Sequence, residues 1–443
     1  MYIAPVSSPA DLGVVEAAAA LAGRVVSSVE LVSACLERIR ERDGEHSFEG
    51  SASAVNAWVR VYEEDALAAA ARADSLRARG AAGALCGIPI GLKDLYGVAG
   101  KPLTASSRVL DDVPARHCEA WARLEVAGMV LLGHLHTHEF AAGGTTDQVG
   151  NPHALDRSAG GSSGGSAAAL ASMTTPAATG TDTAGSLRIP SALCGTATIK
   201  PTRGIVPLDG IVPLSPSFDH AGPMARTVAD CEPLFAALAS REPPEDRRPL
   251  RRVAVSPRIA ELDSDVAAGF ERALARLPVV SAPPPDVALD LGRTLLDVLT
   301  AEMLAYHRRF DDRRALYRPS VRGFLEYAEQ RALQTEEHAA AQRRRPADAA
   351  SWIEWLDANG LDAIVEPTVP IVARPRGAGY DAPFTDFAEI SLTHYWNWTG
   401  FPVVALPAGV GSGGLPVGVS LVGRPGSDWD LLAAGASLQA ELS

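Results

Sequence analysis

A run of six glycines and serines, followed at once by alanines, constrains this 443-residue chain more than any other feature. Residues 160–165 read GGSSGG, and residues 166–170, SAAAL, are a strong helix start. By itself the loop could be a flexible linker or an anion-binding nest. It leads, however, into a helix N-terminus, whose free amides and dipole favour developing negative charge. A linker would not need that helix, and the small neighbours of Ser162 let another backbone segment approach closely.

The rest of the chain alternates between short apolar runs and helical stretches, which predicts an α/β fold. The predicted strands are 88–92, 129–132, 177–180, 253–255, 363–365, 403–406 and 417–422, and the predicted helices are 27–43, 63–79, 117–127, 166–172, 264–277, 292–310 and 323–345. The proline-rich, charged residues 240–252 could mark a domain boundary. Because strand character returns near the C-terminus, we expect a single domain, with a helical excursion at about 256–345 and a segment at about 360–443 that rejoins the sheet.

Composition excludes several classes of function. A net charge of −13 disfavours attraction to nucleic acid or an anionic membrane surface. The five cysteines form no C-x-x-C pair, which fits reduced thiols in a cytoplasm better than a disulfide framework. The N-terminus lacks the charged start of a signal peptide, and no stretch has the apolar density of a membrane helix. We therefore expect a cytoplasmic protein.

Lys93 ends an alternating run and is flanked by Gly91 and Gly97. Its side chain could point from a strand end into the interior, where burial disfavours the ammonium form and lowers the pKa of a lysine. A lysine that acts as a base near neutral pH requires such a shift. The alternative is an exposed lysine paired with Asp94.

Ser186 follows Thr183, Ala184 and Gly185, a run whose small side chains leave successive backbone N–H groups free to converge on one oxygen. That arrangement is typical of an oxyanion hole. The alternative is a tight turn in which Asp182 and Arg188 form an ordinary ion pair.

The combination of these segments resembles the amidase signature family. The resemblance is dense over residues 55–235 and resumes near the C-terminus, and the spacings from Lys93 to Ser162 and from Ser162 to Ser186 are typical of the family. Further agreement lies in residues 133–143, 200–204, 222–227 and 414–423. The resemblance implies the amidase signature fold, a large mixed sheet surrounded by helices, and a serine hydrolase that needs no cofactor and no metal.

Carried over by position, the resemblance implies that Ser186 is the acylated nucleophile, Ser162 a bridging serine held by a cis peptide, and Lys93 the base. Backbone amides of residues 183–186 would hold the oxyanion. Thr181 and Ser163 would support the lysine. Two departures stand out: Ala184 replaces the usual glycine, which is tolerable if its φ is negative, and residues 134–140, HLHTHEF, differ from the usual sequence and could reshape the substrate site.

Two rival mechanisms remain open in the sequence. His134, His136 and His138 follow an H-x-H pattern that metal-dependent amidohydrolases use, although no matching distant ligands stand out. Residues 160–164 also fit the G-x-S-x-G elbow of an α/β hydrolase, which would need a histidine such as His307 or His394.

The substrate is the least constrained expectation. The residues expected near the substrate are His138, Phe140, Tyr395, Trp396 and Trp398; the three last belong to an unusually aromatic segment that could equally be core. If they line the pocket, a small amide or carbamate with an aryl or other bulky apolar group is favoured. The alternatives are the glutaminase-type subunit of an amidotransferase and a non-catalytic binding relative. A homo-oligomer is compatible with the sequence.

Overall fold

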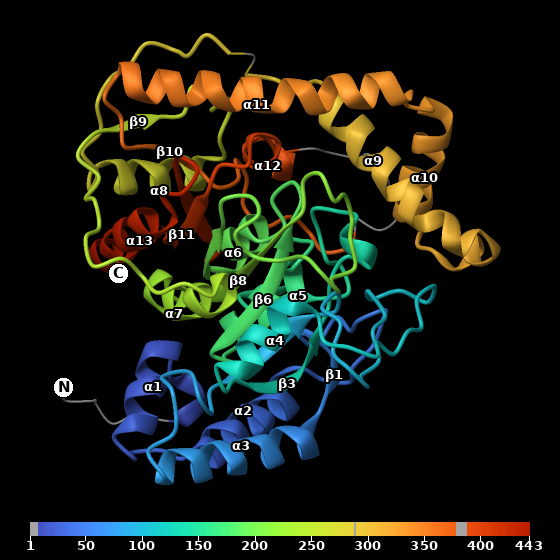
Figure 1. Cartoon of the computed structure of the whole chain (residues 1–443), viewed down its shortest axis with the longest axis vertical. Helices are drawn as coiled ribbons and strands as arrows, with labels where there is room; N and C mark the ends of the chain where they lie inside the picture. Colours follow the sequence, from blue (N-terminus) through green and yellow to red (C-terminus); the bar gives the residue numbers. More distant parts are fainter. Residues whose placement is uncertain (1–7, 288, 378–387) are drawn as a thin grey trace.

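The computed structural model describes residues 8–287, 289–377 and 388–443, and its centre is one mixed β-sheet (Figure 1). Across the sheet the strands are, in order, β1 (Trp58–Val61), β3 (Val130–Leu135), β2 (Pro89–Lys93), β6 (Ala177–Asp182), β8 (His220–Ala225), β7 (Ala197–Lys200), β11 (Val403–Val410), β12 (Pro416–Gly423), β10 (Ala363–Pro367) and β9 (Val253–Val255). Strands β4 (Gly150–Asn151) and β5 (Ala154–Ser158) form a separate pair. The predicted α/β class with a large mixed sheet is confirmed.

The direction of the strands brings the predicted site residues together. Strand β2 runs parallel to both β3 and β6, with Ile90 opposite Ala177 and Gly91 opposite Ala178. Because parallel strands end at the same edge of a sheet, Lys93 at the end of β2 lies beside the segment that follows β6. The strands from β8 to β12 pair antiparallel with their neighbours.

Helices cover the sheet (Figure 1). They are α1 (Val14–Ala22), α2 (Ser28–Arg42), α3 (Glu63–Ala78), α4 (Glu119–Val126), α5 (Gly164–Ala171), α6 (Arg188–Cys194), α7 (Val228–Ala239), α8 (Ser264–Leu274), α9 (Thr294–His307), α10 (Pro319–Arg331), α11 (Thr335–Ala358), α12 (His394–Thr399) and α13 (Asp428–Leu442), with 3-10 turns η1 (Pro9–Asp11), η2 (Glu139–Ala141), η3 (Arg308–Leu316) and η4 (Ala388–Ile390). Helices α1 to α3 lie at one end of the molecule and α11 at the other, next to α9 and α10 (Figure 1).

Local sequence explains where key helices begin. Helix α2 starts with the predicted capping box, in which Ser27 Oγ accepts from the Glu30 amide and the Glu30 carboxylate accepts from the Ser27 amide. Helix α5 is buried along its whole length. A Cβ atom at Gly165 would lie 2.5 Å from the His136 carbonyl oxygen. Glycine is therefore required where α5 packs on the strand end.

Two elements differ from the prediction. The helix expected at 323–345 is two helices, α10 and α11, because the chain turns at Ala332, which has a φ of 43°. Strand β8 was not predicted because it contains Gly222 and Pro223, although it pairs with β6 along its length. In the expected C-terminal segment 360–443, strands β10 to β12 lie in the main sheet, and residues 378–387 lie outside the described part.

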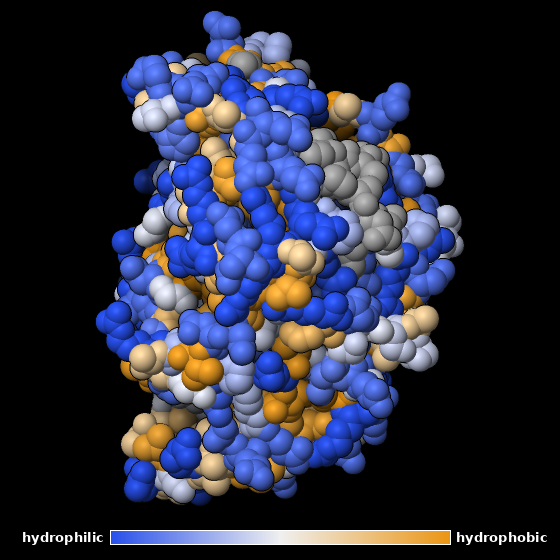
Figure 2. Space-filling model, turned by 90° about the vertical axis from the view of Figure 1, so that its right-hand side faces the viewer, coloured by the Kyte–Doolittle hydropathy of each residue, from blue (hydrophilic) through white to orange (hydrophobic). Residues whose placement is uncertain are grey.

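The described helices include none with both the length and the apolar character needed to cross a bilayer. The face drawn in Figure 2 is mostly hydrophilic, with hydrophobic residues in small groups between charged and polar ones.

Candidate active site

Lys93 is fully buried at the end of β2 and is surrounded by hydroxyl groups. Its Nζ atom lies 2.7 Å from Ser162 Oγ, 2.9 Å from Ser163 Oγ and 2.9 Å from Thr181 Oγ1. The predicted alternative, an exposed lysine paired with Asp94, is therefore wrong. Asp94 instead accepts hydrogen bonds from the backbone and side chain of Thr104 and from the Ser106 amide.

Burial lowers the pKa of Lys93 well below its usual value, and the nearby Asp182 and Asp219 only partly oppose this effect. An ammonium group would have to donate to all three hydroxyls, whereas a neutral amine donates two hydrogen bonds and accepts one. The neutral form can therefore accept a proton from one of the hydroxyls. A lysine in this state can act as a general base.

Ser162 lies between Lys93 and the nucleophile loop, and the peptide bond between Gly161 and Ser162 is cis. The Ser162 carbonyl accepts hydrogen bonds from the His138 amide, at 3.0 Å, and from Thr146 Oγ1, at 3.1 Å. A Cβ atom at Gly161 would lie 2.2 Å from the Thr145 carbonyl oxygen. These contacts fix the backbone on both sides of the serine, as the small neighbours in the sequence indicated.

Ser186 lies in the connection between β6 and α6, and it is 6% exposed, whereas Lys93 and Ser162 are fully buried. The Ser163 amide donates to the Ser186 carbonyl at 3.2 Å, which ties the two serine loops together. Of the three residues, Ser186 alone lines the large cavity described below. The sequence-predicted lysine and serines therefore form one site, with Ser186 at its open side.

The segment Thr183–Ser186 also fits the predicted oxyanion hole. Within the described residues, its four backbone amides donate no hydrogen bond to another protein group. Ala184, the departure from the family pattern, does not adopt a left-handed φ, whereas Gly185 has a φ of 141°. Alanine is thus accommodated at position 184 without backbone strain.

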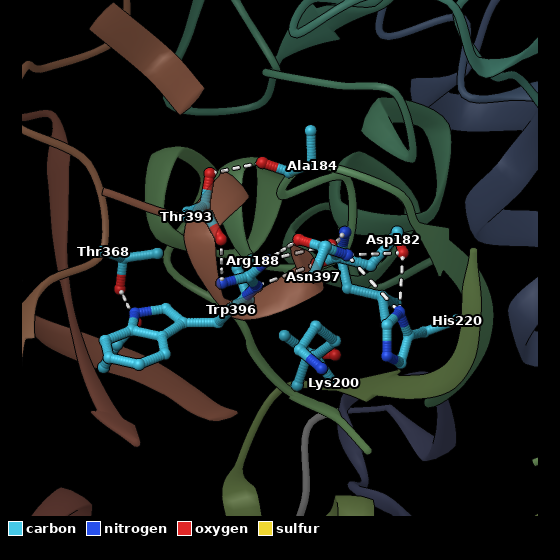
Figure 3. Close-up of polar contacts among 12 residues, drawn as sticks. Asp182, Ala184, Arg188, Lys200, His220, Thr368, Thr393, Trp396 and Asn397 are labelled. Carbon is cyan, nitrogen blue, oxygen red and sulfur yellow. Dashed lines mark hydrogen bonds and ion pairs between the residues drawn. The ribbon is translucent and has the colours of Figure 1, made fainter. Parts of the chain in front are cut away.

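A buried polar network lies behind this segment (Figure 3). Arg188 forms a bidentate ion pair with Asp182, with both N–O distances at 2.9 Å. Asn397 donates to the Asp182 carboxylate at 2.8 Å and accepts from Arg188 at 2.6 Å. The ion pair expected under the alternative for this turn therefore exists, and it coexists with the free amides.

A cavity of about 1040 Å³ opens in front of Ser186. Its lining is mainly apolar and includes side chains from α6, α9, α10 and η4. The apolar residues other than alanine and proline are Ile189, Leu214, Ile259, Leu289, Leu295, Leu296, Leu299, Met303, Phe324 and Ile390, and the charged residues are Arg258, Asp290, Arg293, Arg374 and Glu389. The cavity has the size and chemical character of a site for a bulky, largely apolar molecule.

The structure corrects the predicted substrate residues. His138 lines the cavity, but Phe140, Tyr395, Trp396 and Trp398 do not. They are at most 1% exposed and belong to the core. Their ring contacts and indole hydrogen bonds are with Phe218, Trp352, Tyr317, His307, Asp348 and Glu366. The aromatic segment therefore supports the site from behind, which was the alternative in the sequence.

Sequence reasoning missed the residues that actually border the cavity. Helices α9 and α10 supply Leu295, Met303 and Phe324, and residues 389–394 supply another wall. The apolar periodicity of α9 shows that one face is buried, but it does not show whether protein or a ligand covers that face.

The three clustered histidines do not converge. His134 Nδ1 bonds the Tyr62 hydroxyl, His136 Nδ1 the Ser106 hydroxyl, and His138 Nδ1 the Thr145 carbonyl. Burial lowers the pKa of His136 to about 3 and that of His138 to about 4. In the described ranges, no group of three or more His, Cys, Asp or Glu side chains has a geometry that could hold a metal ion.

The elbow mechanism also lacks its histidine. His307 Nδ1 bonds the Tyr317 hydroxyl, and His394 Nδ1 bonds the Ile390 carbonyl. In the described part of the chain, the side-chain partner of Ser162 Oγ is Lys93 and no histidine ring hydrogen-bonds it.

Comparisons with known proteins agree with this geometry. The family model for amidases matches residues 30–432. The chain is 34% identical to a glutamyl-tRNA(Gln) amidotransferase subunit of Roseiflexus castenholzii over 480 residues, which cover 97% of this chain and 95% of that one. A crystal structure of an amidase has a TM-score of 0.86 and 30% identity, covering 98% of this chain and 100% of that chain. A 6-aminohexanoate cyclic dimer hydrolase has a TM-score of 0.84 and 25% identity, covering 98% and 97%.

Proposed function

This chain belongs to the amidase family, as its motifs predicted, and from that premise we propose that it hydrolyses the C–N bond of a bulky, apolar amide or carbamate. The observation that carries the proposal is the buried Lys93, whose Nζ lies 2.7 Å from Ser162 Oγ and whose pKa burial lowers. Next to it, Ser186 faces an apolar cavity of about 1040 Å³.

In the proposed acylation, neutral Lys93 accepts the proton of Ser162 while Ser162 accepts the proton of Ser186. Ser186 Oγ forms a bond to the substrate carbonyl carbon, and the carbonyl oxygen takes up the negative charge. Backbone amides of residues 183–186 stabilise that charge. When the C–N bond breaks, the leaving nitrogen receives the proton from the Lys93 ammonium through Ser162, and an acyl ester remains on Ser186.

Deacylation follows the same route with water in place of Ser186. The water oxygen bonds to the ester carbon and its proton passes through Ser162 to Lys93. The bond to Ser186 Oγ then breaks, Ser186 regains a proton, and the acid leaves. A carbamate passes through the same steps with a carbonate ester on Ser186, so the relay itself does not select between the two substrates.

The second candidate is a glutaminase-type subunit, which is favoured by the identity to a component of an amidotransferase over nearly the whole chain. Glutamine carries a carboxylate and an ammonium, so its site would offer charged partners. Two cavity arginines are engaged by the protein: Arg258 donates to the carbonyls of residues 289, 391 and 392, and Arg374 lies 3.5 Å from Glu389. This arrangement and the apolar lining favour the bulky amide.

The test is to measure hydrolysis of a bulky anilide, a matched aryl carbamate, acetamide and glutamine by the purified chain. We expect the anilide or carbamate to give the highest kcat/KM and a metal chelator to have no effect. Ser186→Ala should abolish turnover, and Ser162→Ala and Lys93→Ala should reduce kcat by at least about 10³-fold, because each interrupts the proton relay.

Each contrary result points to a specific alternative. Preferential release of ammonia from glutamine would favour the glutaminase-type function. Full activity of Lys93→Ala would exclude the lysine relay, and inhibition by the chelator would reopen the metal-dependent mechanism.

A further inference from the structure

The hydroxyl of Thr393, the residue just before α12, contacts the segment Thr183–Ser186. Thr393 Oγ1 donates to the Ala184 carbonyl at 2.5 Å (Figure 3). A Cβ atom at Gly185 would lie 2.4 Å from Thr393 Oγ1 and 2.8 Å from Thr393 Cβ. Thr393 is 1% exposed, and more than two hundred residues of sequence separate it from Ala184. The contact is therefore a tertiary one, made directly to the peptide between Ala184 and Gly185.

That contact fixes the direction of one amide in the predicted oxyanion hole. In a trans peptide the C=O and the N–H point in opposite directions. Because the Ala184 carbonyl points at Thr393, the Gly185 N–H points away from Thr393, and it donates to no other group of the described protein. We propose that Thr393 is a positioning residue that holds the Gly185 amide in the orientation needed to stabilise the oxyanion formed at Ser186. The proposal rests on the proposed function.

Thr393 is itself held in place by the buried ion-pair network. Arg188 Nη1 donates to the Thr393 carbonyl at 2.9 Å, while the other side of the same guanidinium pairs with Asp182. Both ends of the Ala184–Gly185 segment are thus anchored to one rigid group, since Asp182 precedes the segment and Arg188 follows it. A threonine in this position cannot move away without breaking the Arg188 hydrogen bond.

An ordinary local contact does not account for the hydroxyl. Thr393 Oγ1 also lies 3.3 Å from the Ile390 carbonyl, the usual local acceptor for a threonine in a turn. A hydroxyl has one proton to donate, and the Ala184 carbonyl, at 2.5 Å, is the shorter contact.

The experiment replaces Thr393 with valine, which keeps the shape and removes the hydroxyl. For Thr393→Val we expect kcat to fall by about 10- to 100-fold with little change in KM, below the 10²- to 10³-fold loss typical of deleting an oxyanion donor. Affinity for a trifluoromethyl ketone, which forms a tetrahedral adduct with the nucleophile, should fall by the same factor as kcat. Thr393→Ser keeps the hydroxyl and should retain most of both.

The matched control is Thr399→Val at the end of α12, whose hydroxyl contacts only the helical Tyr395 carbonyl among the described groups, at 3.2 Å. It should leave kcat and ketone affinity unchanged. If Thr393→Val does not fold, Thr393→Cys, with a weaker S–H donor, takes its place, and its kcat should lie below that of Thr393→Ser.

Wild-type kcat and ketone affinity in a folded Thr393→Val or Thr393→Cys would overturn the proposal. So would a loss in Thr393→Ser as large as that in Thr393→Val, because it would indicate packing rather than a hydrogen bond. Failure of the proposed function is a separate outcome, since it would be seen in the wild-type chain as no amide turnover or as turnover that survives in Ser186→Ala.

Discussion

The lowered pKa of Lys93 should determine how activity depends on pH. Only the neutral amine can accept the Ser162 proton, so kcat/KM for an uncharged anilide should fall as pH decreases through the Lys93 pKa. Because burial lowers that pKa, the plateau of activity should begin well below pH 10.4, the usual pKa of lysine. A profile of kcat/KM against pH tests this expectation.

The nearby Asp219 provides the necessary control. Burial raises the pKa of Asp219 to about 6, and this carboxylate accepts a hydrogen bond from Thr183 Oγ1 at 2.5 Å. Its titration could therefore imitate the lysine. Asp219→Asn should keep the acid limb of the profile, and its disappearance in this variant would assign the limb to the carboxylate instead.

Gly185 should tolerate no side chain. Its φ of 141° is rarely adopted by L-residues, and a Cβ would approach Thr393 Oγ1 to 2.4 Å. We expect Gly185→Ala to reduce kcat by at least about 10²-fold, because the peptide must rotate and its amide leaves the oxyanion position. Gly413→Ala is the matched control, since nothing lies within 4 Å of a Cβ there. Equal kcat in the two variants would contradict the prediction.

The sequence was informative about the residues whose local context is distinctive, and silent about those that act from a distance. Lys93, Ser162 and Ser186 each lie in a short segment of small residues that only a close backbone approach requires. Thr393 and Arg258 lie in segments without such a pattern, because their partners are backbone carbonyls far away in the chain. A carbonyl acceptor leaves no trace in the side-chain sequence.

Among the structural elements, the ion pair between β6 and α6 should be important for stability. Arg188→Met would leave the Asp182 carboxylate buried without its cation, at a cost of about 3–5 kcal/mol in the free energy of unfolding. The change can be measured by urea denaturation. Arg40→Met, which removes an exposed partner of Glu63, should cost less than about 1 kcal/mol.

The loss in Arg188→Met should also depend on pH. Burial opposes ionisation of Asp182, but the Arg188 guanidinium outweighs burial and lowers the pKa of this carboxyl. A depressed folded-state pKa stabilises the protein above the unfolded-state value of about 4, and the effect is lost as pH falls toward the folded-state pKa. The difference between wild type and Arg188→Met should therefore be larger at pH 7 than at pH 3. A constant difference would mean that the pair contributes through packing alone.

Elements followed from the sequence wherever local pattern and tertiary setting agreed. The apolar runs at 253–255, 363–365, 403–406 and 417–422 all became strands of the sheet. Strand β8 was missed because Gly222 and Pro223 are poor strand formers. It forms nevertheless, because β6 pairs with it along six positions and Thr198 Oγ1 donates to the Pro223 carbonyl at 2.7 Å. Tertiary pairing overrides local propensity there.

At the scale of the whole molecule, the substrate cavity is assembled from segments that are far apart in the chain. The catalytic side comes from the loops after β5 and β6, and the opposite wall comes from α9, α10 and residues 389–394. Neither part encloses a cavity alone. Reaction chemistry and substrate size should therefore be separable by mutation, since the relay residues and the helical wall share no side chain.

Leu296→Trp tests that separation. Leu296 lines the cavity from α9 and is partly exposed, so a larger ring there has room to enter the cavity instead of disrupting the core. We expect kcat/KM for a bulky anilide to fall by at least about tenfold, while acetamide hydrolysis and the pH profile stay unchanged, because one or two displaced apolar groups are worth about 1–3 kcal/mol of binding. Leu76→Trp, on the surface of α3, controls for the added indole. Equal losses for large and small amides would show that the helical wall acts on the relay itself, and the cavity could then no longer be regarded as a separate determinant of substrate size.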